Sequence, residues 1–177
     1  MENRWREQEA EHLAPLERLV YMTRLVGAEP RLVQWGAGNS SLKWTEQDFR
    51  GEDVPVLRVK ATGAAMASID ASGFAGVRLD VVLPLRERDA VDDAEVSVYL
   101  RHALMEPEGP RPSIETLLHA FIPHAVVLHS HAEPVLALAN AAESARHIAK
   151  LFRGRVFAVE YRRSGFPLAK AVWEGLQ

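Results

Sequence analysis

Apolar residues recur every three or four positions in several parts of the chain, which is the spacing of one face of an α-helix. The first such segment covers residues 13–26, with Pro15 in its first turn and Gly27 directly after it, as is typical of helix ends. A second helix is expected over residues 92–105, where acidic positions at its start favour the positive end of the helix dipole. Further helices are predicted over residues 113–122, 134–140, 144–152 and 167–177.

Other short segments have the apolar alternation or the β-branched residues that favour β-strands. They cover residues 32–35, 41–44, 56–60, 125–128 and 156–161. Strands and helices alternate along the chain, and this order indicates a three-layer α/β domain or a mixed α+β domain.

The composition is that of an ordinary globular domain. The chain has 177 residues, of which 47% are hydrophobic and 25% charged, so it is long enough for one domain with its own core. Its formal net charge of −3 gives no general attraction for nucleic acid or an anionic membrane, and we expect neither partner. The absence of cysteine excludes disulfides, thiolate zinc fingers and a cysteine nucleophile. The first residues lack the apolar region of a signal peptide, so a cytoplasmic protein is expected.

His129 and His131 stand one residue apart at the end of the apolar segment 125–128. Side chains of a strand alternate between its two faces, so both imidazoles are expected on the same face. Two neutral imidazoles that converge on one point can bind a metal ion, most often zinc. The alternative is a polar strand end at which two histidines share a face without a ligand.

Three other segments have residues suited to binding an anion or moving a proton. Residues 36–41 and 61–65 combine glycine with small hydroxyl or amide side chains, and such turns let backbone N–H groups approach phosphate oxygens. Ser113 and Glu115 lie at the start of the helix predicted over 113–122, where phosphate is favoured and a carboxylate can move a proton. Each segment also has an ordinary explanation, since small residues are common in loops and Ser113 suits a helix N-cap.

The order of these motifs resembles that of the class II aldolase/adducin family. The motifs are Gly-Asn-Ser at 38–40, Thr-Gly at 62–63, Pro-Ser-x-Glu at 112–115 and His-x-His at 129–131. The sequence is most similar to the aldolase part of bifunctional rhamnulose-1-phosphate aldolase/alcohol dehydrogenases. Further stretches that support this similarity are residues 32–41, 72–76, 113–123 and 161–169.

This resemblance extends over nearly the whole chain and implies a fold. The expected fold class is α/β, with three α/β/α layers around a mixed, largely antiparallel central sheet. Residues 1–177 are expected to form a single class II aldolase/adducin-like domain. A homo-oligomer, and a tetramer in particular, is expected from the same resemblance.

The resemblance also implies a metal-dependent lyase, with zinc or another divalent metal as cofactor. The expected reaction, in rhamnose metabolism, is aldol cleavage of a phosphorylated ketose such as rhamnulose-1-phosphate to dihydroxyacetone phosphate and an aldehyde. Glu115 corresponds to the catalytic acid/base, and His129 and His131 correspond to two metal ligands. The positions that correspond to ligands of the substrate phosphate are Asn39, Thr62, Gly63 and Ser113.

One part of the family pattern is missing from this sequence. The family's third zinc histidine lies in a later His-Gly segment, and no His-Gly occurs here, so the domain is expected to lack its C-terminal part. His119 is predicted to be packed rather than to bind the metal. The missing histidine favours a non-catalytic, adducin-like binding or assembly module or an inactive truncated domain, whereas Glu115 and the histidine pair favour an active aldolase. A decarboxylase or an epimerase is a third alternative, because the family includes epimerases with the same metal scaffold.

Overall fold

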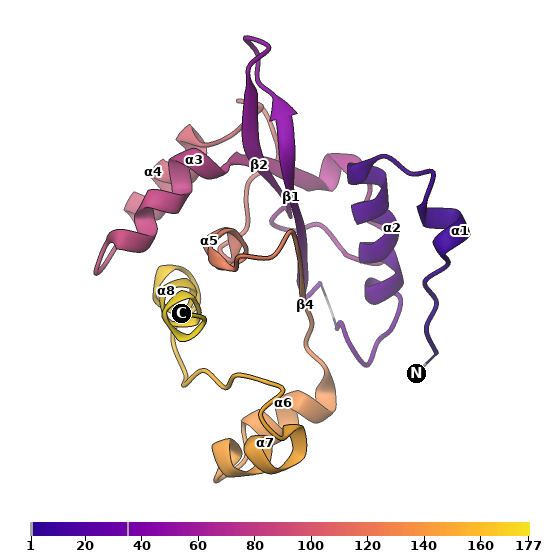
Figure 1. The fold of residues 1–177 in the computed structure, drawn as a ribbon, viewed down its shortest axis with the longest axis vertical. Helices are drawn as coiled ribbons and strands as arrows, with labels where there is room; N and C mark the ends of the chain where they lie inside the picture. The colour runs from indigo at the N-terminus through magenta and orange to yellow at the C-terminus, as the bar shows by residue number, and fades with distance from the viewer. Residues whose placement is uncertain (1, 35) are drawn as a thin grey trace.

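Figure 1 shows the computed structural model, which describes residues 2–34 and 36–177. Its centre is a sheet of four strands in the spatial order β3-β2-β1-β4, and each neighbouring pair is antiparallel. β4 is the last of the four strands in the sequence, yet it pairs with β1, on the side opposite to β2. The strands are β1 (Asn39–Gln47), β2 (Asp53–Lys60), β3 (Phe74–Arg78) and β4 (Val126–His129).

Helices cover both faces of this sheet (Figure 1). α1 and α2 lie on one side and α3, α4, α5 and α8 lie on the other, so the predicted three-layer arrangement is confirmed. α6 and α7 lie beyond the end of β4 and contact each other. The helices are α1 (Glu7–Ala10), α2 (Pro15–Gly27), α3 (Leu79–Val82), α4 (Asp93–His102), α5 (Thr116–Phe121), α6 (Glu133–Ala139), α7 (Ser144–Phe152) and α8 (Phe166–Gly175), with 3₁₀ segments η1 (Ala71–Gly73) and η2 (Leu83–Glu87).

Apolar clusters on the two faces fix the sheet as the middle layer. The larger cluster lies on the α5 side, where Phe121 of α5 packs edge to face against Phe166 of α8 with ring centroids 6.4 Å apart. On the opposite face, Leu19 of α2 packs with Phe74 of β3 in a smaller cluster. α5 is buried along nearly its whole length, since Leu117 near its start and Phe121 at its end both belong to the larger cluster.

The predicted helices are confirmed, with bounds that differ by a few residues. α4 begins where its acidic residues indicate, because the Asp92 carboxylate accepts a hydrogen bond of 2.8 Å from the backbone N–H of Glu95. Within the described part of the chain, no helix has both the length and the apolar character needed to cross a membrane.

Two of the predicted strands are wrong, and the strand β3 is not predicted from the sequence. Residues 156–161 form no strand, and the side chains of Phe157 and Tyr161 are 53% and 90% exposed. Residues 32–34 form a turn and a loop, and Trp35 lies outside the described residues. β3 is short and contains Gly76, where a Cβ would lie 2.6 Å from Nη1 of Arg58, so the close approach of that guanidinium explains the glycine.

Arg58 of β2 forms ion pairs with two glutamates from other parts of the fold, and its replacement is expected to destabilise the domain. Its guanidinium donates to Glu46 of β1 at 2.9 and 2.6 Å and to Glu106 at 3.1 and 2.6 Å, and 13% of its side chain is exposed. Arg58→Met leaves the half-buried Glu46 without its partner, so we expect urea titrations to show a loss of about 1.5–3 kcal/mol in the free energy of unfolding. Arg88→Met is the control, because the pair that Arg88 forms with Glu95 is more exposed. Equal losses in the two variants would contradict this assignment.

Candidate functional site

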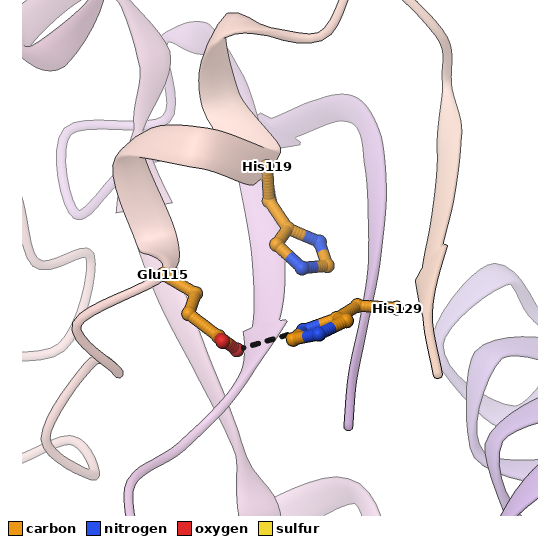
Figure 2. Close-up of side chains that lie close together, drawn as sticks. All are labelled: Glu115, His119 and His129. Carbon is orange, nitrogen blue, oxygen red and sulfur yellow. Dashed lines mark ion pairs between the residues drawn. The ribbon is translucent and has the colours of Figure 1, made fainter. Parts of the chain in front are cut away.

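The predicted catalytic carboxylate and the first predicted metal ligand meet where β4 ends beside β1 (Figure 2). His129 is the last residue of β4 and pairs in the sheet with Asn39, the first residue of β1. Glu115 directly precedes α5, and the His119 N–H bonds to the Glu115 carbonyl at 3.0 Å one turn later. Because residues four apart lie on one face of a helix, the side chains of Glu115 and His119 both point towards His129.

Glu115 and His129 form an ion-pair contact at the centre of the site. Nδ1 of His129 lies 3.2 Å from Oε2 of Glu115, and both side chains are partly exposed. The Asn39 amide donates to the same carboxylate oxygen at 3.1 Å and to Oγ of Ser113 at 2.8 Å. Asn39 therefore holds Glu115 and Ser113 in fixed positions beside each other.

His119 is fully buried, which agrees with the packed position predicted for it. Its Nδ1 and Oγ of Ser41 on β1 are hydrogen-bonded at 2.8 Å, and this bond fixes the direction of the ring. Nε2 of His119 has no hydrogen-bond partner among the described residues, and Nδ1 of His129 forms no hydrogen bond of normal geometry in spite of its closeness to Glu115. Buried nitrogen atoms without partners are costly, so a ligand that binds them would stabilise the site.

Glu115, His119 and His129 each offer a ligand atom, and these atoms all lie within 4.8 Å of one another. One carboxylate and two imidazoles form a donor set that suits zinc and related divalent ions. Since two buried ring nitrogens without a hydrogen-bond partner in the described part of the chain lie beside that carboxylate, the residues fit a divalent metal. His119 thus joins the candidate metal site, and its only signal in the sequence is its spacing of four residues from Glu115.

The charge states of Glu115 and His119 are those that metal ligands need. Burial raises the pKa of Glu115, but the adjacent His129 ring and the Asn39 amide lower it more, so the carboxyl pKa falls to about 2. Burial lowers the pKa of His119 to about 3, against the opposing effect of the Glu115 charge. At neutral pH, Glu115 is therefore ionised and His119 is neutral, as metal binding requires.

His131 lies beside this group rather than within it. Its ring centroid is 4.8 Å from that of His129, so the two rings are neighbours as the strand alternation predicts. The backbone N–H of His131 donates to the Leu32 carbonyl at 2.7 Å. This bond attaches the segment that follows β4 to the segment that precedes β1. The role of His131 as a metal ligand stays a prediction.

The predicted phosphate ligands also lie close together. The Thr62 N–H donates to the Arg111 carbonyl at 3.0 Å and the Thr62 hydroxyl to the Pro112 carbonyl at 3.2 Å, so the turn at 62–63 is attached to the segment that leads into Ser113. Gly63 has a φ of +83°, and apart from Gly63 and its chain neighbours no atom of the described residues lies within 4 Å of the position that a Cβ would take, which leaves the turn open to a ligand. Asn39 already uses both amide hydrogens, so a direct bond from Asn39 to phosphate requires the exchange of one of them.

The N-cap role predicted for Ser113 is wrong. Glu115 is the N-cap of α5, and the Ser113 hydroxyl accepts the Asn39 amide instead. The Ser113 carbonyl alone supports the start of the helix, where it accepts from the N–H and the hydroxyl of Thr116 at 3.1 and 2.7 Å. The hydroxyl of Ser113 therefore belongs to the candidate site, with its own proton available to donate.

The turn before β1 requires glycine at position 38. Its φ is +78°, and a Cβ there would lie 2.9 Å from both the His129 carbonyl oxygen and the sulfur of Met66. The missing side chain lets the backbone pass close to His129 and enter β1 at Asn39.

Lys60 is a charged residue near the site that the sequence motifs do not mark. It ends β2, is 5% exposed, and donates from Nζ to the Ala64 carbonyl at 2.9 Å across the turn at 61–64. Burial lowers its pKa, whereas the Glu115 charge raises it, so Lys60 lies within electrostatic reach of the carboxylate. Its only signal is a lysine at the end of an apolar strand, directly before the Thr-Gly turn.

The fold and this group of residues define the class of protein. Residues 17–177 match the class II aldolase and adducin N-terminal domain, so the chain belongs to the class II aldolase and adducin family. The chain is 41% identical over 162 residues to a protein of Bacillus subtilis (strain 168) named uncharacterized oxidoreductase YuxG. This match covers 91% of the chain and 23% of YuxG, so the chain spans less than a quarter of the length of that relative.

Solved structures include a domain that is similar over almost the whole chain. The N-terminal class II aldolase domain of a conserved protein from Thermoplasma acidophilum has a TM-score of 0.91 and 40% identity, and the match covers 98% of this chain and 80% of that one. YgbL from Escherichia coli has a TM-score of 0.55 and 17% identity over 90% of this chain and 68% of its own, a likeness that shows the fold alone. The α/β class II aldolase fold expected from the sequence is therefore confirmed.

Proposed function

We propose that this domain is a zinc-dependent aldolase that cleaves a phosphorylated ketose of the rhamnulose-1-phosphate type to dihydroxyacetone phosphate and an aldehyde. The observation that carries the proposal is the meeting of Glu115 with ring nitrogens of His119 and His129 that have no hydrogen-bond partner among residues 2–34 and 36–177. Asn39 links this group to Ser113 and thereby to the open turn at 62–63. A cation site next to an anion site suits a substrate with carbonyl and hydroxyl oxygens at one end and phosphate at the other.

His119, His129 and one carboxylate oxygen of Glu115 would hold the metal, with His131 as the further ligand that the sequence predicts. The second carboxylate oxygen of Glu115 would then remain for proton transfer. A bound divalent ion supplies Lewis acidity towards oxygen atoms of the substrate. Ser41 orients the ring of His119 and Asn39 orients the carboxylate of Glu115, so these ligand atoms already have defined positions.

Glu115 is the residue that moves the proton in the proposed reaction. Cleavage removes the proton of the hydroxyl next to the breaking carbon–carbon bond, and the electron pair of that bond stays on the three-carbon phosphate fragment. Glu115 is ionised at neutral pH and can accept this proton. The same carboxyl then returns a proton to the carbon that kept the electron pair, which yields dihydroxyacetone phosphate.

The wider setting follows from the family and from the relatives. The family typically acts on sugar phosphates and forms oligomers, and we propose a homotetramer in the cytoplasm. YuxG is named as an oxidoreductase, and the sequence resembles the aldolase part of bifunctional aldolase/dehydrogenases. We therefore propose that an oxidoreductase consumes the aldehyde product.

Release of dihydroxyacetone phosphate from rhamnulose-1-phosphate or fuculose-1-phosphate by the zinc-loaded chain is the expected result. A coupled assay with glycerol-3-phosphate dehydrogenase measures it as oxidation of NADH. We expect a chelator to abolish the release and added zinc to restore it. Zinc binding without release from either substrate would favour the adducin-like module, whereas an epimerised product or carbon dioxide would favour the epimerase or the decarboxylase.

A further inference from the structure

A pocket of about 1050 Å³ adjoins the predicted phosphate ligands. Thr62 and Ser113 line it on one side, and α4 lines it on the other from Asp93 to Arg101. Ser113 is bonded through Asn39 to Glu115, so the pocket lies directly next to the candidate active site. A phosphate that contacts Thr62 and Ser113 therefore lies at the wall of this pocket.

The charged side chains that line the pocket leave it positive. They are Asp93, Arg101 and Arg111. Asp93 accepts hydrogen bonds from both terminal nitrogens of Arg163 at 2.7 and 3.1 Å, so its charge is already compensated. Within residues 2–34 and 36–177, the side chains of Arg101 and Arg111 form no ion pair, so two guanidinium charges remain for a ligand.

The backbone holds Arg111 beside the predicted phosphate turn. Its carbonyl accepts the Thr62 N–H at 3.0 Å, and Pro112 forms a β-bridge with Ala61. Apolar side chains, among them Val96 and Leu100, line the pocket beside these charges.

We propose that Arg111 is the counter-ion of the substrate phosphate and that Arg101 is a second cation on the opposite wall, so that this pocket selects phosphorylated over unphosphorylated ketoses. A guanidinium suits the task because its parallel N–H bonds match two oxygens of a phosphate. The identity of the ketose rests on the function proposed above. The binding of an organic phosphate by these two arginines does not require turnover.

Calorimetric titration of the zinc-loaded chain with dihydroxyacetone phosphate tests the proposal directly. Arg111→Met is expected to raise the dissociation constant by about 10–100-fold, because charge-assisted hydrogen bonds are lost. Arg101→Met is expected to raise it less, and Arg111→Lys to restore part of the loss, since lysine keeps the charge without the planar fork. Arg88→Met, outside the pocket, is the control and is expected to leave the dissociation constant unchanged.

The outcomes separate this inference from the proposed function. Equal affinity of the wild type and Arg111→Met for dihydroxyacetone phosphate, or no binding by the wild type, would overturn the inference even if aldol cleavage is found. Weaker binding of dihydroxyacetone phosphate by Arg111→Met, together with an absence of aldol cleavage by the wild type, would support the inference and overturn the aldolase assignment. In an active enzyme, Arg111→Met is expected to lower the ratio of kcat/KM for rhamnulose-1-phosphate to that for rhamnulose, chiefly through KM; an unchanged ratio also contradicts the inference.

Discussion

Replacing Glu115 by glutamine is expected to lower the release of dihydroxyacetone phosphate about 10²–10⁴-fold while the domain stays folded. Glutamine keeps the size of the side chain and can still accept the Asn39 amide, but it cannot take up a proton at neutral pH. The coupled assay at saturating substrate and metal measures the loss in kcat, and circular dichroism checks the fold.

The control for this substitution is Glu87→Gln on η2, an exposed glutamate far from the candidate site in the sequence. We expect Glu87→Gln to retain the activity of the unsubstituted chain. Unchanged turnover in Glu115→Gln would remove the acid/base role from that residue and, with it, the proton transfer proposed for the site.

Replacing His129 by alanine is expected to abolish high-affinity zinc binding. His129 supplies one of the three grouped ligand atoms, and its ring lies next to that of His131. It is the histidine that both the sequence motif and the structure assign to the candidate metal site. Metal analysis after dialysis should find about one zinc per unsubstituted chain and little in the variant. At a free zinc concentration of 100 times the dissociation constant, binding adds about 2.7 kcal/mol to stability, so the rise in melting temperature with zinc should also disappear.

Three further variants show which residues complete the metal site. His147→Ala is the control, because His147 is exposed on α7 and is expected to have no effect on zinc content. His119→Asn removes the ring nitrogen that lacks a partner, and His131→Ala removes the ligand that the sequence predicts. Loss of zinc only in His131→Ala would place the metal on the strand pair and leave His119 as a packed residue, whereas loss only in His119→Asn would contradict the ligand role predicted for His131.

The helices of this fold are more predictable from the sequence than its short strands are. Periodic helices with clear ends, such as α2 with Pro15 and α4 with Asp92, are predictable because local residues determine them. The segment 156–161 has the apolar residues of a strand but no partner strand in the structure, and pairing is a tertiary property that composition does not contain. β3 is missed for the opposite reason, since Gly76 weakens its pattern while the neighbouring β2 supplies its hydrogen bonds.

The candidate site is likewise only partly readable from motifs. The resemblance to the family selects Glu115 and His129, and the structure places the two in contact. The orientation of His119 depends on its hydrogen bond with Ser41, which is distant in the sequence, and with this orientation Nε2 has no hydrogen-bond partner among the described residues. No local sequence pattern contains that information. The N-cap prediction for Ser113 fails for the same reason, because Asn39 competes successfully for its hydroxyl.

The pairing of Asn39 with His129 has a consequence for how this domain acquires its site during folding. Because successive side chains of a strand face opposite sides, a slip of β4 by one residue along β1 would turn the His129 ring away from α5 and towards the α2 side. Gly38 permits the native alignment, because a Cβ at this position would lie 2.9 Å from the carbonyl oxygen of His129. Uptake of the proposed metal during refolding would thus report correct strand alignment, and its time course is expected to follow the docking of β4 rather than the formation of the helices.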